Sequence, residues 1–324
     1  MTFSGILVKL CAVLVSFLVF AVAGEIAVRI YTRTHILYDM EMSRYARDLK
    51  LASSDPRIAH VHKPNASARL MGVDVRTNSD GLRDREYPVE RNGNYRVIFL
   101  GDSQTLGWGV RQEESFESLT EEEINKRAPT EIINFGIGNY NAEQETHLFI
   151  EKGLKYRPDQ VAVFYTVNDP EPTPQVRHWS LLEESELLSF YWSRVRGLMF
   201  HFAAAENYRD YYASLYRPDQ PGWETWKKSI VLLKQICQDR GIKLQVVMLP
   251  EPHQLRDYPF EKEYAAVSDF LRANGIEHLD LTPFFKDEAE PARLWVAPDD
   301  GHPNAVGHRL IAQYAFDFIF PRGR

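Results

Sequence analysis

The amino-acid sequence predicts an α/β domain in which a parallel β-sheet carries helices on both faces. Apolar runs of strand length recur after residue 95, at Val97–Leu100, Ile132–Phe135, Val161–Tyr165, Leu244–Leu249 and Ile276–Leu281. Segments with helical periodicity alternate with these runs, at about 114–127, 142–154, 223–240, 261–274 and 304–319. Alternation of this kind produces right-handed strand–helix–strand units and hence a parallel sheet between two layers of helices.

The first predicted strand ends at a serine. Val97–Leu100 is an apolar, β-branched run long enough for a buried parallel strand. It stops at Gly101-Asp102-Ser103, so the serine lies at the carboxyl edge of the sheet, where open α/β folds place their sites. Gly-Asp-Ser is also a common turn sequence, and the role of Ser103 therefore depends on the partners that the rest of the chain supplies.

The amino-terminal segment is predicted to enter a membrane. Residues 5–23 are apolar except for Lys9, and a run of about 20 such residues can span a bilayer. Ala21-Val22-Ala23 also fits the small-residue pattern of a cleaved secretory signal, with cleavage after Ala23. The helical pattern continues to Tyr31, which favours an uncleaved anchor over residues 1–31. A short flank before the anchor and a large polar domain after it predict export of that domain, to the periplasm or the cell exterior.

Two further segments are defined by composition. Residues 32–92 are polar and interrupted by Pro and Gly, which predicts a stalk and a small β extension. Residues 93–324 then form the main domain. Within it, residues 170–222 break the alternation with an aromatic, helical insertion. This insertion could serve as a lid or acyl-binding wall, or it could simply cap the core.

Composition excludes several classes of protein. The 324 residues are 44% apolar and 26% charged, as in ordinary globular proteins. The net charge of −7 and the absence of a basic run argue against a nucleic-acid partner. Cys11 lies in the apolar leader, so the two cysteines of the chain make no disulfide framework. His253 and His308 fall into no spacing typical of a metal site.

The second and third strands end in residues that suit an oxyanion site. Asn134–Asn141 is rich in Gly and Asn, which tolerate positive φ and can turn backbone amides outward. Asn168 follows the third strand and could donate its side-chain amide into the same pocket. Ordinary turn or capping roles would explain these residues equally well when each is taken alone.

A candidate base precedes the last helix. His302 is followed by Pro303, and Asp299 and Asp300 lie three and two residues before it. A carboxylate three residues back in a tight turn can bond one ring nitrogen and leave the other for Ser103, as an activated serine requires. A capping loop is the alternative explanation for this Asp-x-x-His pattern.

These blocks together resemble the SGNH, or GDSL, hydrolase family. The resemblance covers roughly residues 93–320 and rests on Gly101-Asp102-Ser103, on Asn168-Asp169 and on the Asp299-x-x-His302-Pro303 pattern. It implies a three-layer, flavodoxin-like fold with Ser103 as nucleophile, His302 as base and Asp299 orienting the base. The amino-terminal segment is similar to that of exported bacterial members.

The resemblance also implies an oxyanion hole. Its donors would be the Ser103 amide, a backbone amide of the second block (Asn134–Asn141) and the Asn168 side chain. The family commonly has Asn-x-Gly-x-x-Gly in the second block, and here Asn139 stands at the last glycine. Asn139 can still present its amide in a left-handed conformation, and Gly138 is the alternative donor.

The sequence therefore predicts a membrane-anchored, exported serine esterase that needs no cofactor and no metal. Its substrate would be an acylated small molecule, lipid or glycan, such as an acetylated envelope or extracellular polysaccharide. The same groups could instead pass the acyl group to a sugar hydroxyl, and a non-catalytic carbohydrate-binding scaffold is a further alternative. An α/β-hydrolase is excluded, because residues 101–105 read Gly-Asp-Ser-Gln-Thr and not Gly-x-Ser-x-Gly.

Overall fold

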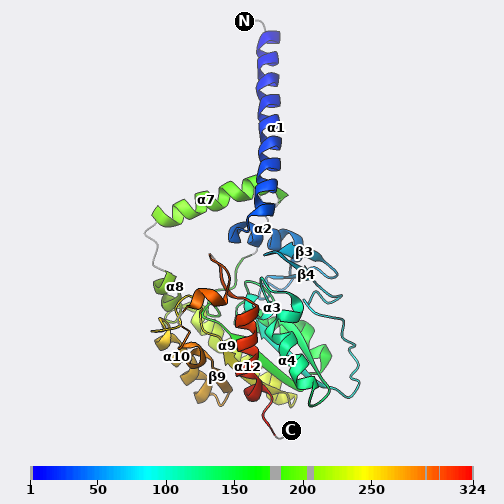
Figure 1. The fold of residues 1–324 in the computed structure, drawn as a ribbon, viewed down its shortest axis with the longest axis vertical. Coiled ribbons are helices and arrows are strands. Elements are labelled where there is room, and N and C mark those ends of the chain that lie inside the picture. The colour runs from blue at the N-terminus through cyan, green and yellow to red at the C-terminus, as the bar shows by residue number, and fades with distance from the viewer. Residues whose placement is uncertain (1–2, 176–183, 203–207, 289, 299, 323–324) are drawn as a thin grey trace. The chain divides into compact units, whose positions relative to one another are not determined.

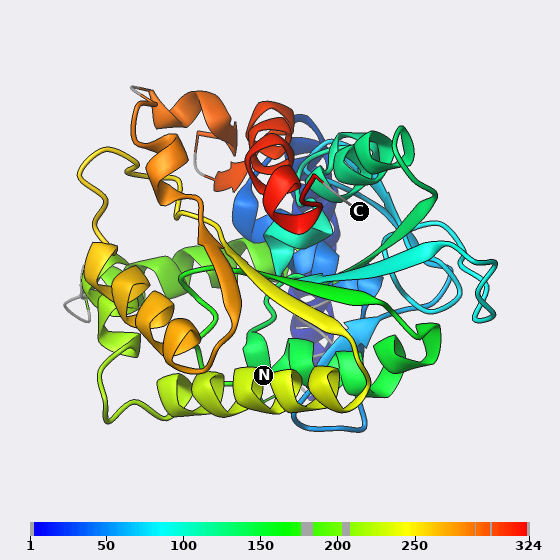
Figure 2. The same cartoon turned by 90° about the horizontal axis from the view of Figure 1, so that it is seen from below.

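The central feature of the fold is a sheet of five parallel strands (Figure 2). The computed structural model describes residues 3–175, 184–202, 208–288, 290–298 and 300–322. The strands lie in the order β6-β5-β7-β8-β9. Their bounds are Tyr95–Gly101 (β5), Thr130–Gly136 (β6), Gln160–Tyr165 (β7), Lys243–Met248 (β8) and Glu277–Asp280 (β9).

The strand order places β5 between β6 and β7. The chain leaves β5 for β6 on one side and then returns to form β7 on the other. A reversal of this kind opens a crevice beyond the carboxyl ends of the strands, which is where such sheets bind ligands. Gly101 pairs with Gly136 and with Phe164, so the three strands end nearly level with one another.

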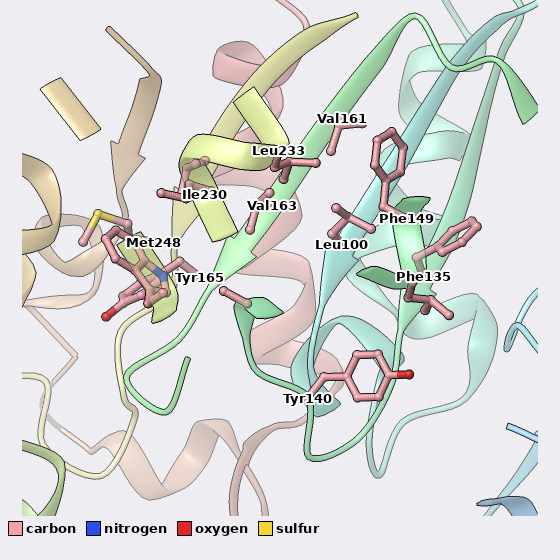
Figure 3. Close-up of a cluster of buried hydrophobic side chains, with 14 of the residues drawn as sticks. Leu100, Phe135, Tyr140, Phe149, Val161, Val163, Tyr165, Ile230, Leu233 and Met248 are labelled. Carbon is pink, nitrogen blue, oxygen red and sulfur yellow. The ribbon is translucent and has the colours of Figure 1, made fainter. Parts of the chain in front are cut away.

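Helices cover both faces of the sheet, which confirms the predicted fold class. Successive residues of a strand point to opposite faces: Val97 and Phe99 lie in one buried cluster, and Ile98 and Leu100 in the other. Figure 3 shows the second cluster, in which side chains of the strands meet those of α9. The helices of this region are α3 (Ser103–Leu106), α4 (Phe116–Asn125), α5 (Ala142–Leu148), α8 (Tyr208–Leu215), α9 (Pro221–Asp239), α10 (Glu261–Ala273), α11 (Thr282–Phe285) and α12 (Ala305–Ile319).

One predicted helix is shorter than its apolar pattern. The helical pattern over 142–154 ends as α5 at Leu148, and a π-helical stretch, Phe149–Gly153, and a 3-10 turn, Leu154–Tyr156, continue it. The Phe149 ring occupies the space that a Cβ at Gly153 would need, at 2.5 Å. The wider turn therefore accommodates a buried aromatic ring against a glycine.

Antiparallel strand pairs precede and follow the sheet. Before the sheet in the chain, β1 (Lys50–Ala52) pairs with β2 (His60–His62), and β3 (Ser67–Leu70) pairs with β4 (Val73–Arg76). Before α12, β10 (Trp295–Ala297) pairs with β11 (Asp300–Pro303). Pro303, the residue after the candidate base, is the last residue of β11 and lies outside α12. The side chain of Asn304 caps α12 by accepting hydrogen bonds from the Val306 and Gly307 amides.

By its internal contacts the chain divides into two units. The sheet unit comprises residues 48–176 and 206–324, and the helical unit comprises residues 1–47 and 177–205. The domain boundaries predicted at residues 31 and 92 stay predictions. Residues 176–183 and 203–207 of the predicted 170–222 insertion lie outside the described residues, and the remainder contains α7 and α8.

The helical unit consists of α1 (Phe3–Thr34), most of α2 (Tyr38–Leu49) and α7 (Glu186–Phe202) (Figure 1). Among the described residues, α1 is the one helix long and apolar enough to cross a membrane. Near its end, Glu25 accepts hydrogen bonds from Arg29 and from the first amides of α7. Arg44 of α2 bonds Glu186, which also accepts from the Thr32 hydroxyl.

Candidate active site

The candidate nucleophile, Ser103, is the first residue of α3, directly beyond the end of β5. Asp102 caps this short helix, because its Oδ1 accepts a hydrogen bond of 2.9 Å from the Gln104 amide. A Cβ at Gly101 would lie 2.0 Å from the Thr105 hydroxyl, and one at Gly136 would lie 2.1 Å from the Leu106 amide. Two glycines therefore let α3 sit close against the strand ends.

His302 lies beside this serine. Its Nε2 is 2.7 Å from the Ser103 Oγ, although 199 positions separate the two residues. The imidazole reaches the serine from β11. The exposed fraction of the His302 side chain is 19%, so it is partly buried. Gly301, the residue before it, packs against the His253 ring, which a Cβ there would meet at 2.6 Å.

The carboxylate that contacts His302 belongs to Asp300. Its Oδ1 lies 2.5 Å from the His302 Nδ1 and also accepts a hydrogen bond from the His302 amide. Its Oδ2 accepts a hydrogen bond of 2.9 Å from the indole of Trp108. Burial alone would raise the pKa of Asp300, but the bonds from His302 and Trp108 outweigh it and hold that pKa below its ordinary value.

Asp299, predicted to orient the imidazole, lies outside the described residues. Asp300 does contact the imidazole, and it lies in the strand Asp300–Pro303 with His302. In this strand the backbone amide and the ring of His302 both face the same carboxylate oxygen.

The second block places a left-handed residue where the chain turns beyond β6. Asn139 has φ 65° and is exposed, whereas Gly138 is buried. The adjacent Ile137 amide bonds the Gly101 carbonyl, so the turn lies beside the end of β5. In the part of the chain that the structure describes, the Asn139 amide donates no hydrogen bond to the backbone. A backbone amide at this position is available to a ligand.

Asn168 lies against the residue that precedes the nucleophile. Its Nδ2 is 3.2 Å from Asp102 Oδ2, and its Oδ1 accepts a hydrogen bond from the Thr166 hydroxyl. Asp102, Thr166 and Asp169 are all buried. The structure thus brings the ends of β5, β6 and β7 together with β11, and places each described residue predicted for the site at this edge of the sheet.

The β1–β2 hairpin braces the second-block turn through contacts that no sequence pattern marks. The Nε2 of His60 lies 3.1 Å from the Gly138 carbonyl oxygen, and Lys50 donates a hydrogen bond of 2.8 Å to Asn139 Oδ1. The Tyr140 hydroxyl bonds the His60 carbonyl. Burial, with a smaller contribution from the Lys50 charge, lowers the pKa of His60 to about 3. His60 is therefore neutral, and its Nε2 carries the proton that the carbonyl accepts.

Arg83 provides a second brace. The guanidinium is buried and donates to the carbonyls of Leu106, Gly107 and Val110, at the end of α3 and in the loop that follows it. No alternating pattern or motif marks these contacts in the sequence, because they join a polar segment to loops far along the chain.

Within the residues that the structure describes, no group of His, Cys, Asp or Glu side chains could hold a metal ion.

The chain is similar to known proteins of one family. A family model for the GDSL-like lipase/acylhydrolase family matches residues 99–310, and no curated protein matches the chain. Among solved structures, the chain is similar to a lipolytic protein of the G-D-S-L family from Desulfitobacterium hafniense DCB-2, with 16% identity, 69% of this chain and 98% of that chain covered, and a TM-score of 0.45.

Two solved esterases are similar to a comparable extent. The psychrotrophic esterase EstA from Pseudoalteromonas sp. has 15% identity, with 69% of this chain and 96% of that chain covered and a TM-score of 0.46. A catalytic mutant of an acetylxylan esterase from Geobacillus stearothermophilus has 13% identity, with 72% and 98% covered and a TM-score of 0.45. Because the family model matches well over half of its residues, this chain belongs to the GDSL-like lipase/acylhydrolase family, a family of ester hydrolases.

Proposed function

We propose that this protein hydrolyses an ester-linked short acyl group by a serine mechanism. The observation that carries the proposal is the continuous hydrogen-bonded series from Ser103 Oγ through the His302 imidazole to Asp300. A serine hydroxyl becomes a nucleophile when a positioned base accepts its proton and a carboxylate holds that base in one tautomer. Asp300 takes the orienting role here, in place of the Asp299 that the sequence favoured.

The reaction would proceed in two steps. Ser103 Oγ attacks the ester carbonyl while its proton passes to His302 Nε2, and Asp300 stabilises the resulting imidazolium. His302 then returns that proton to the departing alcohol, which leaves an acyl group on Ser103. A water molecule, deprotonated by His302, attacks this acyl-enzyme. The bond from the acyl carbon to Ser103 Oγ then breaks, His302 returns its proton to that oxygen, and the carboxylic acid leaves.

The negative charge of each tetrahedral intermediate needs preorganised donors. We assign this role to the Ser103 amide, to the second-block amide of Asn139, with Gly138 as the alternative, and to the Asn168 side chain. The exposure and positive φ of Asn139 support the first of the two second-block donors. Loss of one such donor typically lowers the rate by about 10²–10³.

A small apolar cavity supports a short acyl group. Its volume is about 20 Å³, slightly more than one water molecule needs, so it has room for a group no larger than the methyl of an acetyl group. It borders Gln104 and Pro303, the neighbours of the nucleophile and the base in the chain. Its remaining lining consists of Leu249, Pro250, Pro252, Leu255, Phe285, Leu294, Gly307 and Ile311. An acetyl group suits such a space better than a fatty acyl chain, and an acetylated glycan is the substrate class we favour.

Burst kinetics with p-nitrophenyl acetate test the proposal. Wild-type protein should release one equivalent of nitrophenol rapidly as Ser103 becomes acylated, and Ser103→Ala should show neither burst nor turnover above background. Mass spectrometry should find the added acetyl group on Ser103. Equal turnover by the two proteins would end the serine mechanism.

We further propose that α1 anchors the protein in a membrane with the sheet unit exported. The apolar residues of its central part are exposed throughout, as lipid contact requires. The helix continues through Ala21–Ala23 to Thr34, which supports retention of the segment over cleavage. Amino-terminal sequencing of the membrane fraction tests this, since a new terminus at Gly24 would show that the segment is removed.

A further inference from the structure

We infer that α7 is an interfacial helix, which lies along the membrane surface with one aromatic face in the headgroup region. The inference rests on the proposed anchoring by α1, and it adds a second lipid contact that the apolar leader does not supply. All of its observations come from the helical unit, in which α7 runs across the direction of α1 (Figure 1).

One face of α7 is apolar and exposed. Leu188, Tyr191, Trp192 and Val195 follow the i, i+3, i+4, i+7 spacing of a single helix face. Their exposed fractions run from 44% for Leu188 and Val195 to 61% for Tyr191. Four large side chains exposed side by side on one helix form a patch, and patches of this kind mark a contact with another apolar phase or partner.

The other face of α7 is fixed within the helical unit. Glu186 and Ser189 are buried, and Glu186 accepts hydrogen bonds from Thr32 and Arg44. The Phe190 ring meets Tyr31 edge-on. These partners lie in the last turns of α1 and in α2, after the apolar run. The exposed face of α7 is opposite to these contacts and therefore points towards the apolar residues 5–23 of α1.

The depth of α7 follows from its contact with α1. Leu187 packs against Gly24, where a Cβ would meet it at 3.3 Å. Residues 5–23, which precede this contact, rise by about 28 Å as a helix, close to the roughly 30 Å of a hydrocarbon core. Glu25 and Arg29 form an ion pair immediately after it. Gly24 and the start of α7 therefore lie where the hydrocarbon ends.

The residue types fit that depth. Trp and Tyr are enriched at membrane–water interfaces, because each has an apolar ring and a polar atom that stays in the headgroup region. Tyr191 and Trp192 supply both, and Arg194 lies exposed two residues after Trp192, with its guanidinium over the Phe190 ring. A lipid surface accounts for the pattern, the exposure and the position of this face together.

Site-directed fluorescence quenching in the full-length protein tests the inference. Cys11 is replaced by Ala, and the buried Cys237 stays unreactive. A bimane label is attached at Tyr191→Cys or Val195→Cys, and the protein is reconstituted in vesicles whose phospholipid carries a doxyl quencher near the headgroup or near the chain end. Both labels should lose most of their emission, and more of it with the shallow quencher.

Two further labels make each outcome decisive. Val15→Cys, in the middle of α1, should be quenched most by the deep quencher, and Val231→Cys, an exposed aliphatic position on α9, should keep its emission. Quenching at Val15 without quenching at 191 and 195 would overturn the inference and leave the anchor intact. This is also the result expected if a soluble partner or the sheet unit covers the face. No quenching at Val15 would overturn the anchoring proposal and the inference together.

Discussion

The Nε2 atom of His60 lies 3.1 Å from the carbonyl oxygen of Gly138. That carbonyl and the Asn139 amide belong to one planar trans peptide group, so the oxygen and the amide hydrogen point in opposite directions. A donor that holds the oxygen on one side therefore fixes the direction of the amide on the other. Lys50 also holds Asn139, because the Lys50 ammonium group donates a hydrogen bond to the Asn139 side-chain oxygen.

Replacement of His60 should therefore reduce kcat more than it changes KM. His60→Leu removes the donor to the Gly138 carbonyl, and we expect kcat for p-nitrophenyl acetate to fall by about 10- to 100-fold, at or below the roughly 10²–10³ cost of losing an oxyanion donor outright. His60→Gln, which can place an amide N–H near the same carbonyl, should recover much of the loss. Stopped-flow acylation rates measure both variants.

His62→Leu is the matched control. His62 lies in the same strand, is also buried, and contacts the Gly81 carbonyl instead. It should lose stability like His60→Leu but keep the wild-type kcat. If both leucine variants lose activity in proportion to their unfolding, the hairpin contributes only to stability.

Asp300 should prove more important for the reaction than Asp299. In Asp300→Asn the geometry of the hairpin is nearly preserved, but an amide no longer stabilises the imidazolium or selects the reactive tautomer. We expect kcat to fall by about 10³- to 10⁴-fold. Steady-state kinetics of Asp299→Asn, measured in parallel, should show a much smaller loss, and the reverse ranking would return the orienting role to Asp299.

The activity should also depend on the ionised state of Asp300. Its pKa lies below the ordinary value, so the carboxylate stays charged on lowering the pH until well into the acid range. The stabilisation that this carboxylate gives the fold is present above the ordinary carboxyl pKa and is lost as the pH falls through the depressed one.

The strands could be predicted because each is a short apolar run between polar turns. The predicted Val97–Leu100 lies inside β5, and the observed strand extends it by three residues. The left-handed tolerance of Asn139 was also visible in the sequence. The strand that carries His302 was not visible, because β11 has four residues without an apolar run and forms only by pairing with β10. The braces from His60 and Lys50 left no signal, since a single long-range hydrogen bond creates no periodicity.

The size of the acyl cavity predicts a preference for short esters. Wild-type kcat/KM should be highest for p-nitrophenyl acetate and should fall steeply from butyrate to octanoate. Leu255→Ala removes a buried lining side chain and should shift the preference towards longer chains, with a loss of stability of about 2–5 kcal/mol. A flat chain-length profile in the wild-type protein would show that the acyl group lies elsewhere.

Glu145 should make the protein less stable as the pH rises. It is buried in α5, and within the described residues neither carboxylate oxygen has a hydrogen-bond partner. Burial, together with the charges of Asp169 and Asp102, raises the pKa of Glu145 well above its ordinary value. The folded protein therefore keeps a proton that the unfolded chain releases above the ordinary carboxyl pKa. The stability that this proton carries is complete below that pH and is lost as the pH rises through the folded pKa.

Glu145→Gln removes this dependence, because its amide cannot ionise. Relative to wild type, the free energy of unfolding of the variant should increase by about 1.4 kcal/mol per pH unit between the two pKa values. Urea denaturation at successive pH values measures the difference. Glu123→Gln, which alters an exposed carboxylate on α4 paired with Lys126, should show no such gain. Parallel plots of unfolding free energy against pH for wild type and Glu145→Gln would contradict the prediction. They would mean that Glu145 is ionised in the folded protein and that other groups stabilise its charge.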